Sequence, residues 1–108
     1  MFKINGNEIS ITRGDSASFS VTLKHEDESA YSLDPEATIT FTVKKDTSQP
    51  KSLIKKTNTG DTSFTLAPED TSSLKYGEYV YDIQLNVGEE VLTVVEPTLF
   101  TVTEEVTW

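Results

Sequence analysis

The side chains that could carry acid–base or nucleophilic chemistry are few and scattered in this sequence. It has one histidine, His25, and no cysteine. Its serines and threonines fall mainly on strand faces expected to meet solvent, and none lies in a Gly-x-Ser-x-Gly turn that would expose a nucleophilic serine. Glycine-rich phosphate-binding loops are also missing. The sequence therefore predicts a protein that is not an enzyme, with no catalytic residues and no cofactor.

The one run of adjacent metal-ligating side chains comprises His25, Glu26, Asp27 and Glu28. Calcium loops place their ligands at alternating positions around a glycine that permits the turn, and this run has neither feature. Adjacent carboxylates are usually solvated. We therefore expect no metal site, with a weak divalent-cation site as the alternative.

Arg13, Gly14 and Asp15 form the tripeptide that integrins recognise. Glycine and aspartate are also residues that reverse the chain between two strands. A match of three residues arises often by chance. We interpret this tripeptide as an ordinary turn, with an adhesive role as the alternative.

Length and charge limit the classes of partner. A chain of 108 residues has room for one core, so we expect a single domain over residues 1–108. Its 9 basic and 18 acidic residues give a net charge of -9, which repels nucleic acids and anionic lipid surfaces. No signal-peptide run and no apolar segment of about 20 residues is present. We expect no nucleic-acid or membrane partner, and a cytoplasmic protein unless a larger assembly carries it out.

The segment from Leu74 to Leu85 is expected to organise the scaffold. Tyr79, Tyr81 and Ile83 alternate with polar residues, as in a half-buried strand. Gly77, two residues before Tyr79, gives a pattern that resembles the tyrosine corner of immunoglobulin-like sandwiches, where the tyrosine hydroxyl bonds to the backbone just upstream. This segment therefore predicts a central strand that follows a tight turn.

Alternating apolar and polar residues predict the other strands. One short first strand alternates over residues 2–4 and 8–12 about a tight turn or bulge at residues 5–7, and the others span residues 16–24, 37–44, 52–57, 62–66, 91–95 and 99–103. We expect residues 52–57 and 62–66 to form a hairpin, and Pro97 to mark a bulge or edge that breaks the last strand in two. A proline followed by two acids predicts one short helical turn near residues 68–74. The fold class is therefore all-β, an immunoglobulin-like antiparallel β-sandwich of about seven or eight strands.

Tyr81 stands where an immunoglobulin domain has the second cysteine of its inter-sheet disulfide. We expect Tyr81 to face Val21 and, together with Phe41, to replace the disulfide and tryptophan with apolar contacts. The predicted structural core is Val21, Phe41, Tyr79, Tyr81 and Ile83.

Three segments occur in a characteristic order, namely Ile11–Val21, Ile39–Lys45 and Leu74-x-x-Gly77-x-Tyr79-x-Tyr81-Asp82-Ile83. Together they resemble the N-terminal domain of phage baseplate upper proteins, over nearly the whole chain. The resemblance implies an immunoglobulin-like fold in which the Gly-Asp turn leads into the second strand. Full baseplate upper proteins continue into helical and receptor-facing regions, whereas this chain stops at Trp108. Two alternatives stay open: an excised domain that attaches the rest of such a protein to the tail, or a short relative that decorates or connects virion subunits.

The resemblance implies a non-enzymatic phage or prophage virion structural protein, a tail or baseplate component that is assembled in the bacterial host cytoplasm. Its expected partners are other virion proteins, with a homo-oligomer as a further candidate. We expect contacts at open strand edges near residues 51–56 and 97–103, and at Trp108 unless it folds back onto its own sandwich. The candidate interface residues are Lys55, Lys56, Phe100 and Trp108. The alternative is an immunoglobulin-like module that binds a cell-surface glycan or protein, although most aromatic residues are predicted to point inward.

Overall fold

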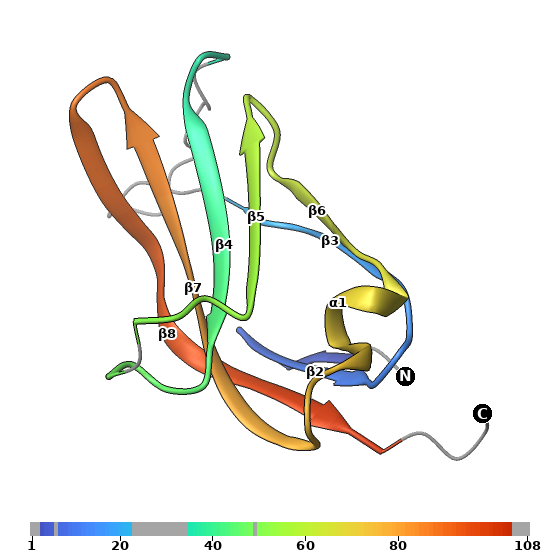
Figure 1. Cartoon of the computed structure of the whole chain (residues 1–108). Helices are drawn as coiled ribbons and strands as arrows, with labels where there is room; N and C mark the ends of the chain where they lie inside the picture. Colours follow the sequence, from blue (N-terminus) through green and yellow to red (C-terminus); the bar gives the residue numbers. More distant parts are fainter. Residues whose placement is uncertain (1–2, 6, 23–34, 49, 105–108) are drawn as a thin grey trace.

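The computed structural model describes residues 3–5, 7–22, 35–48 and 50–104, which form eight strands and one short helix (Figure 1). The strands are β1 (Lys3–Asn5), β2 (Glu8–Thr12), β3 (Ala17–Ser20), β4 (Thr38–Lys44), β5 (Ile54–Thr59), β6 (Ser63–Leu66), β7 (Gly77–Val87) and β8 (Glu90–Thr103), and the helix is α1 (Pro68–Ser72). The predicted helical turn is confirmed. Residues 23 and 24 of the predicted second strand lie outside the described residues.

The strands form two sheets that face each other. The larger sheet has the order β1-β2-β8-β7-β4-β5, and the smaller sheet pairs β3 with β6. The neighbours β8, β7, β4 and β5 correspond to strands G, F, C and C′ of an immunoglobulin-type sandwich, and β3 with β6 corresponds to B with E. The predicted all-β, sandwich-like fold is confirmed.

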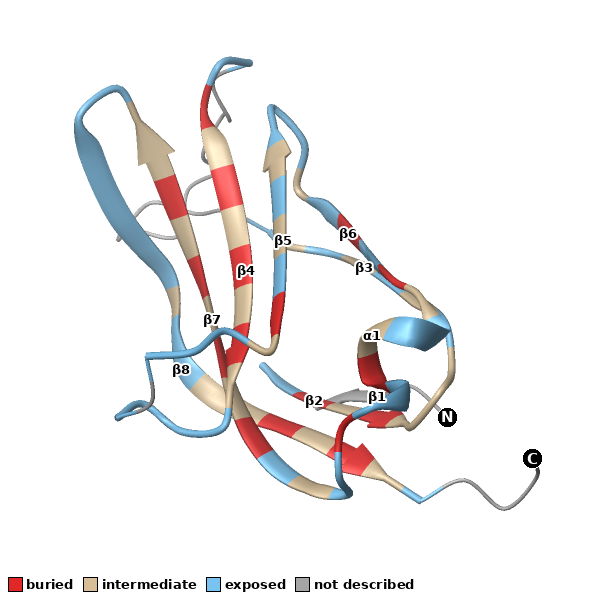
Figure 2. Cartoon of the chain, in the orientation of Figure 1, coloured by how far each residue is buried: buried red, intermediate tan, exposed pale blue. Residues whose placement is uncertain are grey.

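The alternation of residues along β4 and β7 explains how these two central strands of the larger sheet face the core. Every second residue of β4 is buried, and β7 repeats this pattern from Tyr79 to Leu85 (Figure 2). Threonine occupies the other face of β4 up to Thr42, where β-branched side chains favour extended backbone. Each of these strands therefore presents one apolar face to the core.

One strand pair departs from the expected antiparallel arrangement. β2 runs parallel to the end of β8, with Ile9 opposite Phe100 and Thr12 opposite Thr103. The turn at residues 13–16 carries the chain from β2 in the larger sheet to β3 in the smaller one. β2 therefore stays beside the last strand and does not form a hairpin with β3.

The predicted hairpin between residues 52–57 and 62–66 is wrong. β5 pairs with β4, whereas β6 pairs with β3 in the other sheet. Ile54 and Phe64 are both buried, and they reach the core from opposite sheets. The turn at Gly60 therefore connects two sheets.

The predicted irregularity at Pro97 is confirmed as a bulge, but the predicted division of the last strand in two is wrong. β8 has 14 residues, and its register with β7 is irregular between the Tyr81–Thr98 and Ile83–Val95 pairs. Pro97 lies in this interval and has no N–H to donate, so the ladder is interrupted there without ending the strand.

Candidate interaction surface

The tyrosine corner is present and fixes the start of β7. The Tyr79 hydroxyl donates a hydrogen bond to the carbonyl oxygen of Lys75 at 2.6 Å. Gly77, with φ of 140°, lies between the two residues in a conformation that favours glycine. The Lys45 ammonium lies 5.0 Å from the centre of the Tyr79 ring. The bond to Lys75 is the corner that the sequence predicts, and it holds the segment between α1 and β7 to the start of the central strand.

An aromatic cluster occupies the place of the missing disulfide. The Phe41 ring lies 5.4 Å from that of Tyr81 and 5.3 Å from that of Phe19, measured between centroids. Phe41, Tyr79, Tyr81 and Ile83 are buried, as predicted. Val21 is half-buried, and it lines with Tyr81 a cavity of about 320 Å³ between the sheets. The core therefore depends on ring packing, with Phe41 near its centre.

Tyr81 also connects the core to the N-terminal part of the chain. Its hydroxyl donates a hydrogen bond to the carbonyl oxygen of Asn7. Burial raises the pKa of Tyr81 above the usual 10.0, because the charged phenolate is poorly solvated there. This tyrosine therefore acts as a neutral core residue.

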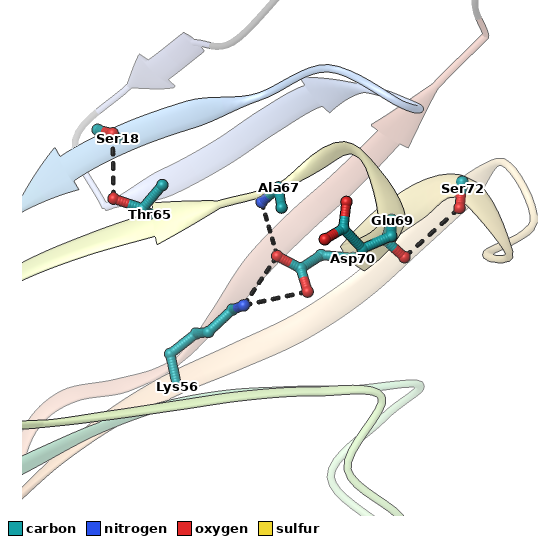
Figure 3. Close-up of polar contacts among 7 residues, drawn as sticks. All are labelled: Ser18, Lys56, Thr65, Ala67, Glu69, Asp70 and Ser72. Atoms are coloured by element: carbon teal, nitrogen blue, oxygen red, sulfur yellow. Dashed lines mark hydrogen bonds and ion pairs between the residues drawn. The ribbon is translucent and has the colours of Figure 1, made fainter.

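Lys56 is a poor interface candidate because it already has a partner within the chain. Its ammonium lies 2.9 Å from a carboxylate oxygen of Asp70, which also accepts a hydrogen bond from the Ala67 N–H at 2.7 Å (Figure 3). On β5 the side chains alternate, so Lys56 shares the inner side with buried Ile54, whereas Lys55 is exposed on the outer side. Lys56 therefore joins β5 to α1, and Lys55 is the lysine that a partner could reach.

The other predicted interface residues have different outcomes. Phe100 is fully buried, because its ring packs in the core 6.2 Å from that of Phe41 and 6.4 Å from that of Tyr81, so a partner could not reach its side chain. Trp108 and the run from His25 to Glu28 lie outside the described residues. Within the described ranges, no group of three or more His, Cys, Asp or Glu side chains could hold a metal ion.

The Arg13-Gly14-Asp15 segment has the geometry of a turn. Gly14 has a φ of 84°, and its N–H donates to the hydroxyl of buried Thr71 at 2.9 Å. The Asp15 N–H donates to the Thr12 carbonyl, and the Arg13 guanidinium lies 4.5 Å from the centre of the Tyr76 ring. These contacts connect the turn to α1 and account for the tripeptide without an external partner.

Sequence reasoning misses the most exposed apolar surface of the described chain. On β8, Val91 is 63% exposed, Leu92 42% and Val94 36% (the pale blue part of β8 in Figure 2). β2 pairs with β8 only from Phe100 to Thr103, so residues 90–95 have β7 on one side and no described strand on the other. The open edge thus includes residues 90–95, which were not predicted, whereas β2 covers the predicted 97–103 segment from Phe100 onward. The one feature of the sequence that could have indicated this exposed surface is the apolar run Val91–Val95, in which apolar and polar residues do not alternate strictly.

The outer face of the larger sheet carries a shallow polar cleft. Its volume is about 290 Å³, and its lining includes Thr42, Lys44, Lys55, Asp82 and Gln84. These residues come from β4, β5 and β7, with Thr42 paired to both Lys55 and Asp82. The cleft offers hydrogen-bonding groups and charges of both signs.

The fold and these surfaces define an all-β, sandwich-like protein that has, in the part of the chain that the structure describes, an open apolar strand edge. No protein-family model, curated protein or solved structure matches this chain. Among the described residues, α1 is much too short to cross a membrane, and no helix has the length and apolar character to do so.

Proposed function

We propose that this chain is a non-enzymatic structural module of a phage or prophage virion that docks on other tail or baseplate proteins through its strand edges. The exposed apolar edge at residues 90–95 of β8 is the observation that carries this proposal. An unpaired strand offers a row of backbone N–H and C=O groups to an incoming strand. The virion assignment itself rests on the resemblance of three segments of the sequence to baseplate upper proteins.

The composition of this edge suits association better than solvent exposure. Natural proteins usually protect an edge strand with lysine, proline or a bulge. Residues 90–95 have only Glu90 as a charged residue and no lysine or proline. One register irregularity lies among them, between the Gln84–Thr93 and Ile83–Val95 pairs, and Pro97 comes after them. Leaving Val91 and Leu92 exposed has an energetic cost that a docked partner would remove.

The proposal is tested by looking for the chain in particles. We expect tail-containing particles, purified from the bacterium that carries the gene after prophage induction, to contain this chain at a fixed ratio to the major tail protein. Quantitative mass spectrometry across a density gradient measures this ratio. A chain that stays in the soluble fraction while tail proteins sediment together contradicts the proposal.

The polar cleft is the observation that favours the second candidate, an immunoglobulin-like module that binds a cell-surface glycan. Sugar sites usually add an exposed aromatic ring on which the sugar stacks. Among the described residues that line this cleft, the one aromatic residue is Tyr81, whose ring packs against Phe41 in the core and so offers no stacking surface there. Binding of host cell-wall polysaccharide that is lost in Asp82→Ala and Gln84→Ala would favour this candidate over docking.

A further inference from the structure

Within the described part of the chain, the larger sheet has open edges at both ends of its four-strand part β8-β7-β4-β5. β5 is the last strand on one side, and its Lys55, Thr57 and Thr59 are exposed. On the other side, residues 90–95 of β8 lack a second neighbour. Each open segment is about six residues long, since β5 spans Ile54–Thr59.

Charge is divided between these edges. Residues 44–56, which include part of β5, contain five lysines and a single acid, Asp46. Residues 76–108, which include β7 and β8, contain no lysine or arginine and seven acids, at positions 78, 82, 89, 90, 96, 104 and 105. On the two open edges themselves, the exposed charged residues differ in sign: Lys55 on β5, and Glu90 and Glu96 on β8.

The two edges also match in level along the strands. One row of paired residues crosses the four strands from β5 to β8, and it consists of Thr57, Thr40, Gln84 and Thr93. Thr57 and Thr93 therefore lie at the two ends of the same row. The next row on the same face runs from Lys55 through Thr42 to Asp82, and it ends at the bulge that contains Glu96. Lys55 on one edge is therefore level with Glu96 on the other.

Strand direction completes the match. The strands β8, β7, β4 and β5 alternate in direction, because each neighbouring pair is antiparallel. A second copy placed beside the first in the same orientation would bring its β8 antiparallel to β5. Antiparallel pairing is the favourable arrangement for adding a strand to an edge.

We propose that copies of this chain associate head to tail, with the β5 edge of one copy pairing with residues 90–95 of β8 in the next. Lys55 of one copy then lies opposite Glu96 of its neighbour, and the exposed side chains of Val91 and Leu92 are covered. A symmetric contact lacks this attraction, because two β8 edges carry only acids, Glu90 and Glu96, and the exposed charge of two β5 edges is Lys55 on both. This inference goes beyond docking on another virion protein, which a monomeric chain could also do.

The test uses charge reversal on the full chain, followed by sedimentation velocity over a range of concentrations at about 0.15 M salt, which screens the long-range repulsion between copies of net charge -9. The wild type is expected to form species larger than a monomer as its concentration rises. Lys55→Glu and Glu96→Lys should each weaken association by at least about tenfold, since each places like charges opposite one another. The double variant K55E/E96K should restore it.

Matched controls change the same charge away from the edges. Lys75→Glu and Glu78→Lys alter exposed residues and should associate like the wild type. Circular dichroism verifies the fold of each variant. If the double variant fails to fold, an equimolar mixture of the two single variants provides the same opposite-charge pairs between copies. A wild type that stays monomeric, a rescue that does not occur, or a dimer that neither single change affects overturns the proposal.

Discussion

At the scale of single residues, two tyrosines of β7 have separate roles. The Tyr79 hydroxyl bonds to the backbone of Lys75 and fixes the corner, and the Tyr81 ring packs against Phe41 in the core. Sequence reasoning finds both residues because their roles follow from local spacing: a glycine two residues before the first tyrosine, and the alternation of an inward-facing strand.

Phe41 should be the most sensitive position in the core. Its ring lies within 6.2 Å of the rings of Phe19, Phe64, Tyr81 and Phe100, measured between centroids. Phe41→Ala should lower the free energy of unfolding by about 3 to 5 kcal/mol, measured by urea unfolding. Val91→Ala, at an exposed site, should change it by less than about 0.5 kcal/mol. A loss below about 1 kcal/mol for Phe41→Ala would show that the aromatic cluster does not hold the sheets together.

Tyr81 should make stability depend on pH in the alkaline range. Burial raises its pKa in the folded protein above the 10.0 of a solvated tyrosine, so the folded protein keeps this proton at a pH where the unfolded chain loses it. Unfolding then releases a proton, and the free energy of unfolding falls as the pH rises above 10. Below that pH the contribution is fully present.

The corresponding measurement compares wild type and Tyr81→Phe by urea unfolding at neutral and at alkaline pH. The variant loses the hydrogen bond to Asn7, so it should be less stable at neutral pH, and the difference between the two proteins should shrink as the pH rises through the alkaline range. Equal slopes for the two proteins would contradict the buried, neutral state of Tyr81.

At the scale of elements, the turn at Gly60 carries the chain from β5 to β6. Its φ is +67°, and a Cβ added there would meet the Pro35 carbonyl oxygen at 2.7 Å. Gly88, in the β7–β8 turn, has a similar φ of +59° but no heavy atom within 4 Å of an added Cβ. Substitution at Gly88 therefore tests the backbone strain alone, whereas substitution at Gly60 adds a steric conflict with Pro35.

Gly60→Ala and Gly88→Ala should both destabilise the protein, by about 1 to 2 kcal/mol for the left-handed backbone conformation. Gly60→Ala should cost about 1 to 3 kcal/mol more, because the backbone of Pro35 must move. Thermal and urea unfolding measure both variants. Equal losses would mean that Pro35 does not pack against this turn as the structure shows.

The strands were predictable where local pattern decides, and their partners were not. The alternation of Ile39, Phe41 and Val43 is enough to predict β4 and its buried face. Nothing in residues 52–66 indicates that β5 and β6 join different sheets, since a turn with glycine serves a hairpin and a crossing equally well. Long-range pairing likewise decides the parallel β2–β8 contact and the burial of Phe100.

The candidate surface was predictable only in part, for the same reason. The lysines of β5 already indicate an edge strand, and the alternation of side chains along that strand then predicts that Lys55 is exposed. Exposure of Val91 depends on where β2 begins to pair with β8, and this is set by residues about 90 positions away in the sequence. An apolar run alone cannot distinguish a covered strand from an open edge.

At the scale of the whole molecule, we infer that the aromatic core stabilises a sheet whose edges contact the protein's partners. Lys55 is exposed on its β5 edge, and on its β8 edge Val91 and Leu92 are exposed between Glu90 and Glu96. Such a module would act through the shape and charge of its edges. Its activity should therefore respond to edge substitutions that leave the folded state intact.

The most direct measurement is the incorporation of edge variants into particles. Val91→Lys places a charge on the open β8 edge without disturbing the core, and Ser73→Lys places the same charge at an exposed site at the end of α1. In a host whose own copy of the gene is deleted, wild type and Ser73→Lys should appear in purified particles at the same ratio to the major tail protein. Val91→Lys should be depleted at least about tenfold, since burying an unpaired lysine opposes strand pairing. Equal incorporation of all three proteins, or absence of the wild type from particles, would contradict the account.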